Sequence, residues 1–368
     1  MLPLFKYYPI FVKKIPYLKI GDFPTPVEKL KNLGNKFNCK NLYIKRDDLS
    51  SDTYGGNKVR KLEFILAEVL KNRKKVIFTF GLAGSNHAVA STIYAKKVGL
   101  KCILMLLPQP NAHYLQRNLL LDYYFGANLH QKKNAIFLTF TIAIEIIRQI
   151  IITGTIPVII PPGGSSKIGI IGFVNAAFEL KEQIDSGVIL EPDYIYLSIG
   201  SMGSAIGLIL GLKVLGLKSK VISIRVVDHK YSNLKKMMKL FKKVNNYLHN
   251  IEPSFPIIKI TAKDFNIRHD FFGKQYGLFT KQGVEAAKLI QENEGIMLDG
   301  TYTAKTFAAV INDIEKNNFN DKVILFWNTY NSNDLSKFIA KVNYKQLPKK
   351  FHYYFTSSVQ PLDNDCKI

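Results

Sequence analysis

The sequence is poor in cysteine, and its first residues do not have the pattern expected of a secretory signal. Its three cysteines, Cys39, Cys102 and Cys366, are odd in number and lack metal-ligand spacing, so we expect neither a disulfide framework nor a metal site. Few cysteines favour a reducing compartment, and we expect a cytoplasmic protein. The first 20 residues have interspersed lysines and no small-residue cleavage site after an apolar core, which does not predict a signal peptide.

Arginine is scarce although the chain is strongly basic. Only seven of the 51 basic residues are arginine, and the net charge of +23 is spread along the sequence. Specific recognition of bases or phosphates favours arginine, so no nucleic-acid partner is expected. The densest basic stretch, residues 229–243, fits a solvated helix face or an anion-binding face, and we favour the solvated face.

No apolar run is long enough, without interruption, to predict a membrane span. The longest, residues 135–162, is broken by Glu145, Arg148 and Gly154 and ends at two prolines. Because about 18 clean apolar residues are needed to cross a bilayer, we predict a buried helix over 135–152 followed by a buried strand.

The remaining pattern predicts an α/β protein. At 368 residues the chain suits two domains. Short apolar strands alternate with helices from residue 58 onward, which indicates parallel sheet with right-handed crossovers. A double glycine near residue 58 and a proline-glycine cluster near residue 162 suggest boundaries, giving a larger domain of residues 1–58 and 163–368 and a smaller domain of residues 59–162. Residues 244–272 show weak periodicity and are predicted to be irregular.

Lys58 is the first candidate functional residue. It follows "YGGN", where glycines allow a sharp turn, and it begins an apolar-periodic run typical of a helix. The positive end of a helix dipole disfavours a cation there but not a neutral amine or an imine. The alternative is a loop lysine that reaches solvent.

Two further turns could bind anions. "SIGSMGSAIG" (198–207) links a predicted strand to a helix, and its glycines and free N–H groups suit a phosphate or carboxylate. It matches neither the dinucleotide fingerprint nor a Walker loop, and tight packing is the alternative. "GSNHA" (84–88) offers Ser85, Asn86 and His87 for a carboxylate, with ordinary helix capping as the alternative.

These parts together suit one cofactor. A lysine at a helix start, a phosphate loop that is not a nucleotide loop and a carboxylate loop are what an enzyme needs to hold a phosphorylated aldehyde as an imine, and pyridoxal 5'-phosphate fits. Tyr276 and Tyr302 also stand just before predicted helices, although loop tyrosines more often serve in packing.

The sequence resembles the pyridoxal-phosphate enzymes that include D-cysteine desulfhydrase and 1-aminocyclopropane-1-carboxylate deaminase. The resemblance runs from Thr25 to about Leu325. It rests on the motifs "IKRDDL" (44–49), "GGNKVRKLEF" (55–64), "GSNHAVA" (84–90), "PPGGSSKIGIIGF" (161–173), "GSMGSAIG" (200–207), "YGL" (276–278) and "EGIMLDGTYTAKTF" (294–307).

The resemblance implies a two-domain, three-layer α/β/α fold of the tryptophan-synthase-β-like class (fold type II), with the larger domain binding the cofactor. It implies that Lys58 is the Schiff-base lysine. Ser85, Asn86 and His87 would hold the substrate carboxylate and the ring, and Tyr276 and Tyr302 would donate or accept protons. The implied catalytic residues are Lys58, Ser85, Tyr276 and Tyr302, and the implied cofactor contacts are Asn57, Lys58, Asn86, Gly200, Ser201, Met202, Gly203, Ser204 and Thr303.

One position bears on the reaction. Thr303 stands where the cyclopropane-cleaving relatives carry a glutamate against the pyridine nitrogen, and a hydroxyl makes the ring a weaker electron sink. A weaker sink favours α,β-elimination, in which a β-leaving group relieves the carbanion. We therefore predict a deaminating lyase that converts D-cysteine to pyruvate, ammonia and hydrogen sulfide, with Lys58 removing the α-proton. The alternatives are 1-aminocyclopropane-1-carboxylate deaminase and a non-catalytic basic binding protein.

The chain departs from the family near its end. "WNTYN" replaces the expected "HTGG", which adds side chains close to the cofactor and bears on substrate size. Relatives of this fold are commonly dimers, so we expect a homodimer that acts on a small amino acid without a nucleic-acid or membrane partner.

Overall fold

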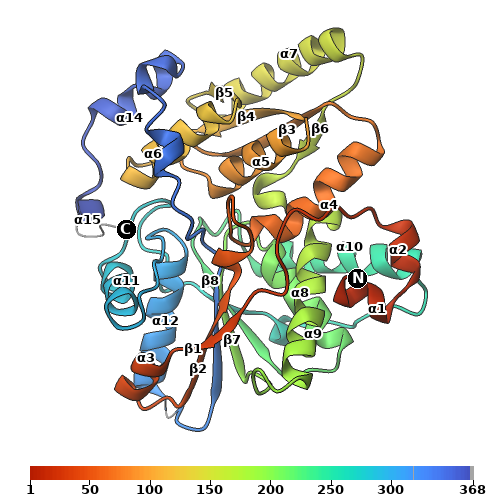
Figure 1. Cartoon of the computed structure of the whole chain (residues 1–368), viewed down its shortest axis with the longest axis vertical. Coiled ribbons are helices and arrows are strands. Elements are labelled where there is room, and N and C mark those ends of the chain that lie inside the picture. Colours follow the sequence, from red (N-terminus) through yellow and green to blue (C-terminus); the bar gives the residue numbers. More distant parts are fainter. Residues whose placement is uncertain (318, 365–368) are drawn as a thin grey trace.

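Two sheets form the framework of the computed structural model, which describes residues 1–317 and 319–364 (Figure 1). The six-stranded sheet has the order β1 (Val27–Lys29), β2 (Asn41–Arg46), β10 (Val323–Asn328), β7 (Tyr194–Ile199), β8 (Lys220–Arg225) and β9 (Asn266–Arg268). Only the β1–β2 pair is antiparallel. The four-stranded sheet is parallel throughout, in the order β5 (Asn128–Gln131), β4 (Lys101–Leu107), β3 (Val76–Leu82) and β6 (Val158–Ile160).

Helices cover both faces of each sheet. They are α1 (Pro3–Tyr7), α2 (Ile10–Lys14), α3 (Lys31–Lys36), α4 (Lys58–Lys71), α5 (Asn86–Lys97), α6 (His113–Tyr124), α7 (Ala135–Thr153), α8 (Lys167–Asp185), α9 (Gly203–Val214), α10 (Leu234–Ile251), α11 (Lys281–Glu294), α12 (Thr303–Lys316), α13 (Ser336–Ile339), α14 (Tyr353–Thr356) and α15 (Pro361–Asn364). Short 3-10 turns are η1 (Asp47–Leu49), η2 (Pro162–Gly164), η3 (Ala262–Asp264), η4 (Tyr344–Gln346) and η5 (Lys349–Phe351). The predicted three-layer α/β/α class is therefore confirmed.

The larger sheet divides two apolar cores. On one side α8, α9 and α10 pack around Leu197, Leu325 and Trp327. On the other, α11 and α12 pack around Tyr196 and Phe326. Because β2, β7, β8 and β10 are parallel, their carboxyl ends meet at one edge, and the loops that follow β7 and β10 lie close together there.

A buried ionic network fixes the start of α4 against this sheet. Arg60 pairs with Asp47 at 2.7 Å and with Glu179 of α8 at 2.8 Å, and Lys45 of β2 meets Glu179 at 2.6 Å. Burial opposes ionisation, but Arg60 and Lys45 hold the pKa of Glu179 at about 2. Since Lys58 lies two residues before Arg60, the network also positions Lys58.

The C-terminal segment crosses to the smaller sheet. Leu335, Leu347, Phe351 and Tyr354 pack in the core that α4, α5 and α6 form with β3 and β4. In Figure 1 this segment, with α14, lies beside α6. The domain division expected from the sequence assigned it to the larger domain. That division stays a proposal, and these contacts indicate that the tail would be counted with the smaller unit.

Residues 135–152 form a helix as predicted, but the prediction that this helix is buried is wrong. The helix exists as α7, but Phe140, Ile144 and Ile151 are 67%, 67% and 78% exposed. By length and composition alone, residues 136–153 suffice to cross a membrane, and 17% of that window is buried. Only one side of α7, which includes Leu138, packs on the four-stranded sheet. The opposite side of the helix has no partner among the described residues and is therefore exposed.

Two smaller expectations also differ. Residues 244–272 are not irregular throughout, since α10 continues to Ile251 and β9 forms at residues 266–268. Strand β5 was not predicted, because "NLHQ" has one buried apolar residue, Leu129. The basic stretch before residue 244 runs into α10, where its lysines are exposed and Met237 and Phe241 are buried, so a solvated helix face remains the prediction.

Candidate active site

The loop before α4 needs its glycines. Gly56 has φ +95°, and a Cβ there would lie 2.8 Å from the carbonyl oxygen of Tyr330 and 2.9 Å from that of Thr329. Asn331 accepts the N–H of Gly55 at 2.6 Å. The close passage of two backbone segments therefore sets where the helix begins and where Lys58 points.

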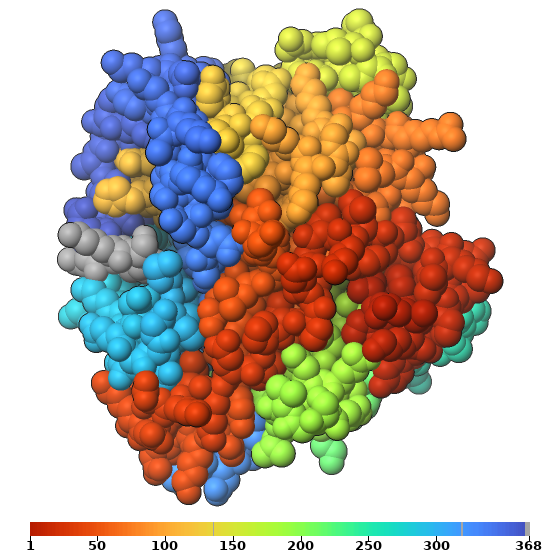
Figure 2. All heavy atoms as spheres, viewed as in Figure 1, coloured from red at the N-terminus to blue at the C-terminus, as the bar shows by residue number. Residues whose placement is uncertain are grey.

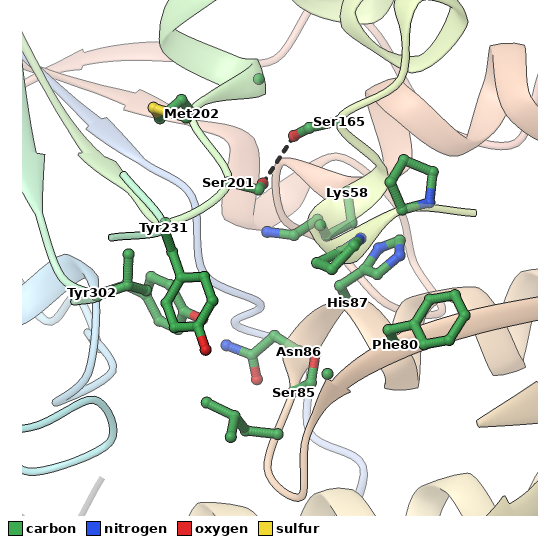
Figure 3. A pocket seen from close by; sticks show the side chains of 18 of the residues that line it. Lys58, Phe80, Ser85, Asn86, His87, Ser165, Ser201, Met202, Tyr231 and Tyr302 are labelled. Atoms are coloured by element: carbon green, nitrogen blue, oxygen red, sulfur yellow. Dashed lines mark hydrogen bonds between the residues drawn. The ribbon is translucent and has the colours of Figure 1, made fainter. Parts of the chain in front are cut away.

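Lys58 projects into a cavity of about 450 Å³ that is lined from both sheets (Figure 3). Its Nζ donates to Asn57 Oδ1 at 2.6 Å. Burial lowers the pKa of Lys58 to about 8, and nearby Asp299 opposes that shift. Lys58 therefore points into the cavity rather than to the outer surface, and roughly a tenth of this amine is uncharged at neutral pH.

The glycine-rich loop after β7 forms a cradle at one end of the cavity. All five of its predicted residues line the cavity: Gly200, Ser201, Met202, Gly203 and Ser204. Met202 has φ +66°, a conformation uncommon for a side chain of this kind, and it precedes the first turn of α9. Asn57 donates to Ser204 Oγ at 3.0 Å, which ties the cradle to the lysine loop. This arrangement suits an anion at a helix start.

Lys61 completes this end of the cavity and was not predicted. A Cβ at Gly203 would come within 3.0 Å of Lys61 Nζ and closer still to Ser165 Oγ, so glycine lets both side chains approach the loop. Lys61 is 2% exposed, and its Nζ donates to Gly163 O at 3.0 Å and Ser165 Oγ at 3.3 Å. Burial, and then Lys58, lower the pKa of Lys61 well below its ordinary value.

No carboxylate within hydrogen-bonding distance of Lys61 is found among residues 1–317 and 319–364. A buried amine with two neutral acceptors at the edge of a glycine cradle fits the dianionic phosphate of a cofactor. Ser165 and Ser201, linked at 2.7 Å in Figure 3, add hydroxyls to the same wall.

The loop before α5 meets the cavity from the smaller sheet. Ser85 caps the helix by accepting the N–H of Ala88 at 3.3 Å, as the alternative reading proposed, and it lines the cavity as well. Asn118 donates to Asn86 Oδ1 at 2.9 Å, which leaves the amide NH₂ of Asn86 for a ligand. Hydroxyl, amide and helix N–H groups thus gather where a carboxylate would bind.

His87 lies deeper in the wall than its neighbours. It is 3% exposed, and its Nε2 lies 2.9 Å from Thr79 Oγ1. Burial, then Lys58 and Lys61, hold the pKa of His87 well below its ordinary value. A neutral imidazole engaged with Thr79 suits a cavity wall better than a carboxylate contact.

Two tyrosines converge opposite this loop. The hydroxyl oxygens of Tyr276 and Tyr302 are 2.5 Å apart, both residues line the cavity, and their rings meet edge to face. Burial raises the pKa of Tyr276 well above its ordinary value. The pair can share and relay a proton beside a bound ligand.

Thr303 does not line the cavity, contrary to its expected place at the pyridine nitrogen. Its Oγ1 accepts the N–H of Asp299 at 2.8 Å and the residue is 1% exposed, so the hydroxyl is committed to the first turn of α12. Asp299 lines the cavity instead, with Oδ1 accepting the N–H groups of Thr301 and Tyr302. Burial raises the pKa of Asp299 to about 6.

The "WNTYN" segment contributes one side chain to the cavity rather than filling it. Thr329 lines the cavity and its hydroxyl lies 3.3 Å from that of Ser198, whereas Tyr330 points away and accepts from Arg117 Nη2 at 2.8 Å. Arg117 belongs to α6 of the smaller unit, so its hydrogen bond to Tyr330 connects the loop after β10 to that unit. The sequence offered no signal for this pairing, which only the fold brings together.

One side of the cavity is apolar, where Phe80, Met105 and Leu107 of β3 and β4 and Leu138 of α7 pack together. Leu240 of α10 also lines the cavity. Tyr231 is 56% exposed and lies at the solvent-facing edge of the cavity, across from Asn86 in Figure 3. No group of three or more potential metal-ligating side chains occurs in the described part of the chain.

Comparison with known proteins gives a consistent result. The family described as pyridoxal-phosphate-dependent enzyme matches residues 18–329. D-cysteine desulfhydrase of Klebsiella pneumoniae is 32% identical over 323 residues, covering 86% of this chain and 94% of that protein. A Pyrococcus furiosus protein provisionally named 1-aminocyclopropane-1-carboxylate deaminase is 31% identical over 317 residues, covering 85% and 91%. The solved structure of an ACC deaminase homologue superposes with a TM-score of 0.75 at 29% identity, covering 90% of this chain and 99% of that one.

Proposed function

The chain belongs to the family of pyridoxal-phosphate-dependent enzymes, and from this premise we propose that it catalyses α,β-elimination on a small amino acid, D-cysteine in the first instance. The products are pyruvate, ammonia and hydrogen sulfide. The observation that carries the proposal is the pair of lysines that line one cavity, with the Lys58 amine bonded only to Asn57 and the buried Lys61 set against the glycine cradle.

The cofactor assignment defines what each end of the cavity does. When bound, pyridoxal phosphate supplies an electron sink for charge that develops at the substrate's α-carbon. Lys61, Ser165 and the backbone of the Gly200–Ser204 loop would hold its phosphate. Lys58 would hold its aldehyde carbon, and Asn57, whose Oδ1 accepts from the Lys58 amine at 2.6 Å, would orient that amine.

The chain's own groups then bind the substrate and move protons. Ser85, the amide of Asn86 and the first N–H groups of α5 hold the substrate carboxylate, which turns the α-hydrogen toward Lys58. The substrate's amino group would displace Lys58 from the aldehyde carbon, and the freed amine of Lys58 would remove that proton. Burial lowers the pKa of this amine to about 8, which increases the fraction that can accept a proton.

The leaving group needs a proton as the carbon–sulfur bond breaks. The Tyr276–Tyr302 pair can deliver one, since either hydroxyl donates to the other across 2.5 Å and both face the cavity. Hydrolysis of the remaining unsaturated amine by water gives pyruvate and ammonia. Sulfur leaves as sulfide, so the atoms balance without an added oxidant or reductant.

Elimination is proposed over ring opening because the neutral hydroxyls of Ser198 and Thr329 lie next to each other in the cavity. The carboxylate that lines the cavity, Asp299, accepts the backbone N–H groups of Thr301 and Tyr302. The named desulfhydrase relative supports the same choice. The apolar side of the cavity, around Phe80 and Leu138, also accommodates an S-alkyl group, so we expect thioethers of cysteine to be turned over.

A substrate panel tests the proposal. The yellow holo-protein is incubated with D-cysteine, L-cysteine, S-ethyl-D-cysteine and 1-aminocyclopropane-1-carboxylate, and sulfide, thiol, pyruvate and 2-oxobutyrate are measured. Pyruvate with equimolar sulfide from D-cysteine is the expected result. If 2-oxobutyrate appears from the cyclopropane and no pyruvate from either cysteine, the deaminase is the correct reaction.

We further propose a homodimer located in the cytoplasm. Two of the three cysteines, Cys39 and Cys102, are buried free thiols, which suits a reducing compartment.

A further inference from the structure

Helix α7 carries an apolar surface that is exposed. Five large side chains lie 3, 4, 3 and 4 residues apart along it and are 59–78% exposed: Phe137, Phe140, Ile144, Ile147 and Ile151, which we call the α7 seam. Spacing of this kind places all five on one stripe. The stripe is continuous over about four turns of helix.

The seam is not the face with which α7 packs on its own sheet. Leu138, Ile142 and Ile146 face β3 and β4, together with Phe78 and Met105. The seam therefore points outward, and Figures 1 and 2 place α7 at the outer end of the smaller unit.

Neighbouring residues widen the surface. Ile159 of β6 is 52% exposed, and it lies on the α7 side of the sheet because its register partner, Phe78, packs against that helix. Ile136, Ile150, Ile152 and Ile156 are 37–69% exposed. Taking roughly 150–200 Å² for a fully exposed large apolar side chain, these ten residues expose on the order of 1,000 Å².

An area of that size exceeds what a monomer usually leaves in water. The largest apolar patch of a typical monomer is about 300–600 Å², and a stable interface buries about 800 Å² on each partner. The α7 surface is therefore large enough to support one specific interface by itself.

We propose that the α7 seam pairs with the seam of a second copy of this chain across a two-fold axis. A two-fold interface requires a surface complementary to itself. The seam meets that requirement because it is apolar throughout, whereas a seam with charge of one sign would repel its copy. The repeat of 3 and 4 residues is also the one by which side chains of two helices interlock.

Charge near the seam is compatible with this pairing. Arg148 flanks the seam, 61% exposed, and its Nη1 lies 3.5 Å from Glu145, which faces inward. The net charge of +23 opposes association of two copies, but the lysines are spread over the chain and are screened over about 8 Å at physiological salt. Pairing should accordingly strengthen as salt is added.

Pairing would also bear on the active site. Leu138 lies between seam residues on the same helix and lines the cavity. Fixing α7 against a partner therefore fixes part of the cavity's apolar side. The pairing itself rests on the exposure of α7 and not on the reaction proposed above.

Sedimentation equilibrium of the holo-protein tests the proposal. The wild type is expected at twice the chain mass of 41.8 kDa. Ile144→Asp, at the middle of the seam, is expected to weaken pairing by on the order of 100-fold or more, because it buries two unpaired like charges. Leu190→Asp is the matched control, since Leu190 is 63% exposed but lies in the loop before β7, and it should pair as the wild type does.

Cross-linking gives an independent measurement if Ile144→Asp does not fold. Ile144→Cys should form a disulfide-linked dimer under mild oxidation, because residues near a two-fold axis approach their own copies, and Leu190→Cys should not. The cofactor absorbance and thermal melting of each variant report folding separately from assembly.

Three results would overturn the proposal. One is a wild type that sediments as a single chain up to about 100 µM. A second is a dimer whose dissociation constant is unchanged in Ile144→Asp and that gives no cross-link through Ile144→Cys. The third is a monomer that floats with phosphatidylserine vesicles, is released by salt and requires Ile144, in which case lipid covers the surface.

Discussion

Replacing Lys61 by methionine should change cofactor affinity and the stability of the cofactor-free protein in opposite directions. Methionine keeps most of the buried stem and removes the amine. Without cofactor, the amine of Lys61 is buried with two neutral acceptors, Gly163 O and Ser165 Oγ, and burial lowers its pKa well below the ordinary value. Such a group destabilises the folded state until an anion binds beside it.

The two magnitudes follow from general values for these interactions. A hydrogen bond between a cation and a phosphate contributes about 1.5–3 kcal/mol, so the affinity for pyridoxal phosphate should fall roughly 10- to 150-fold. The cofactor-free variant should gain about 1 kcal/mol in free energy of unfolding, since relief of desolvation outweighs two lost hydrogen bonds.

Pyridoxal without its phosphate isolates the contact. Titration of the cofactor-free proteins, followed by the absorbance of the bound cofactor, gives both dissociation constants. Lys61→Met should lose affinity for pyridoxal phosphate and keep its affinity for pyridoxal within about threefold. Lys71→Met, an exposed position on the same helix, should change neither.

The reasoning would be refuted by an equal loss for both ligands, which would show a displaced Lys58 rather than a missing phosphate contact. It would also fail if affinity for pyridoxal phosphate were unchanged, since the cradle would then hold the phosphate without Lys61. Urea unfolding of the two cofactor-free proteins tests the second half, and a less stable variant would contradict it.

Three other perturbations have definite expected outcomes. The rate at which cofactor-free protein captures pyridoxal phosphate should rise with pH and level off above about pH 8, because Lys58 must lose its proton to react. Stopped-flow absorbance over pH 6–10 measures this rate, and Lys58→Ala should stay colourless. Tyr302→Phe should lower kcat by about 10²–10⁴ while the cofactor absorbance is kept, since only a proton-transfer group is removed. Glu179→Gln should cost about 3–5 kcal/mol in urea unfolding at pH 7 by leaving Arg60 and Lys45 underpaired. Because the folded-state pKa of Glu179 lies below its ordinary value, that stabilisation is present above about pH 4.5 and is lost as the pH falls toward 2.

Local pattern was sufficient to predict the elements that form the site. The strand-turn-helix units at "GSN" and "GSMGS" and the helix that starts at Lys58 appear where the periodicity and the glycines indicated. Such units are determined by neighbouring residues, and the parallel sheets then bring their turns together. The cofactor was also predicted from the sequence, and the match to the pyridoxal-phosphate-dependent enzyme family confirms it.

Partners distant in sequence could not be predicted in this way. Asp299 and Thr329 enter the cavity only because α12 and β10 pack where they do, and Thr303 turns its hydroxyl to the backbone of Asp299. The error on α7 has a different cause. Its composition predicts removal from water, but composition does not say whether the chain's own core or another molecule covers the helix.

Lys61 could have been found from spacing alone, and its place explains why the start of α4 suits this cofactor. Residues three apart on a helix share a face, so Lys58 and Lys61 both point into the cavity from the first turn of α4. Two ammonium groups at the positive end of a helix repel each other, and Lys58 lowers the pKa of Lys61 accordingly. A phosphorylated aldehyde would relieve both lysines together, because one amine would hold its carbonyl carbon and the other would pair with its phosphate. A neutral aldehyde would satisfy Lys58 alone, which is why the comparison of pyridoxal with its phosphate is the informative one.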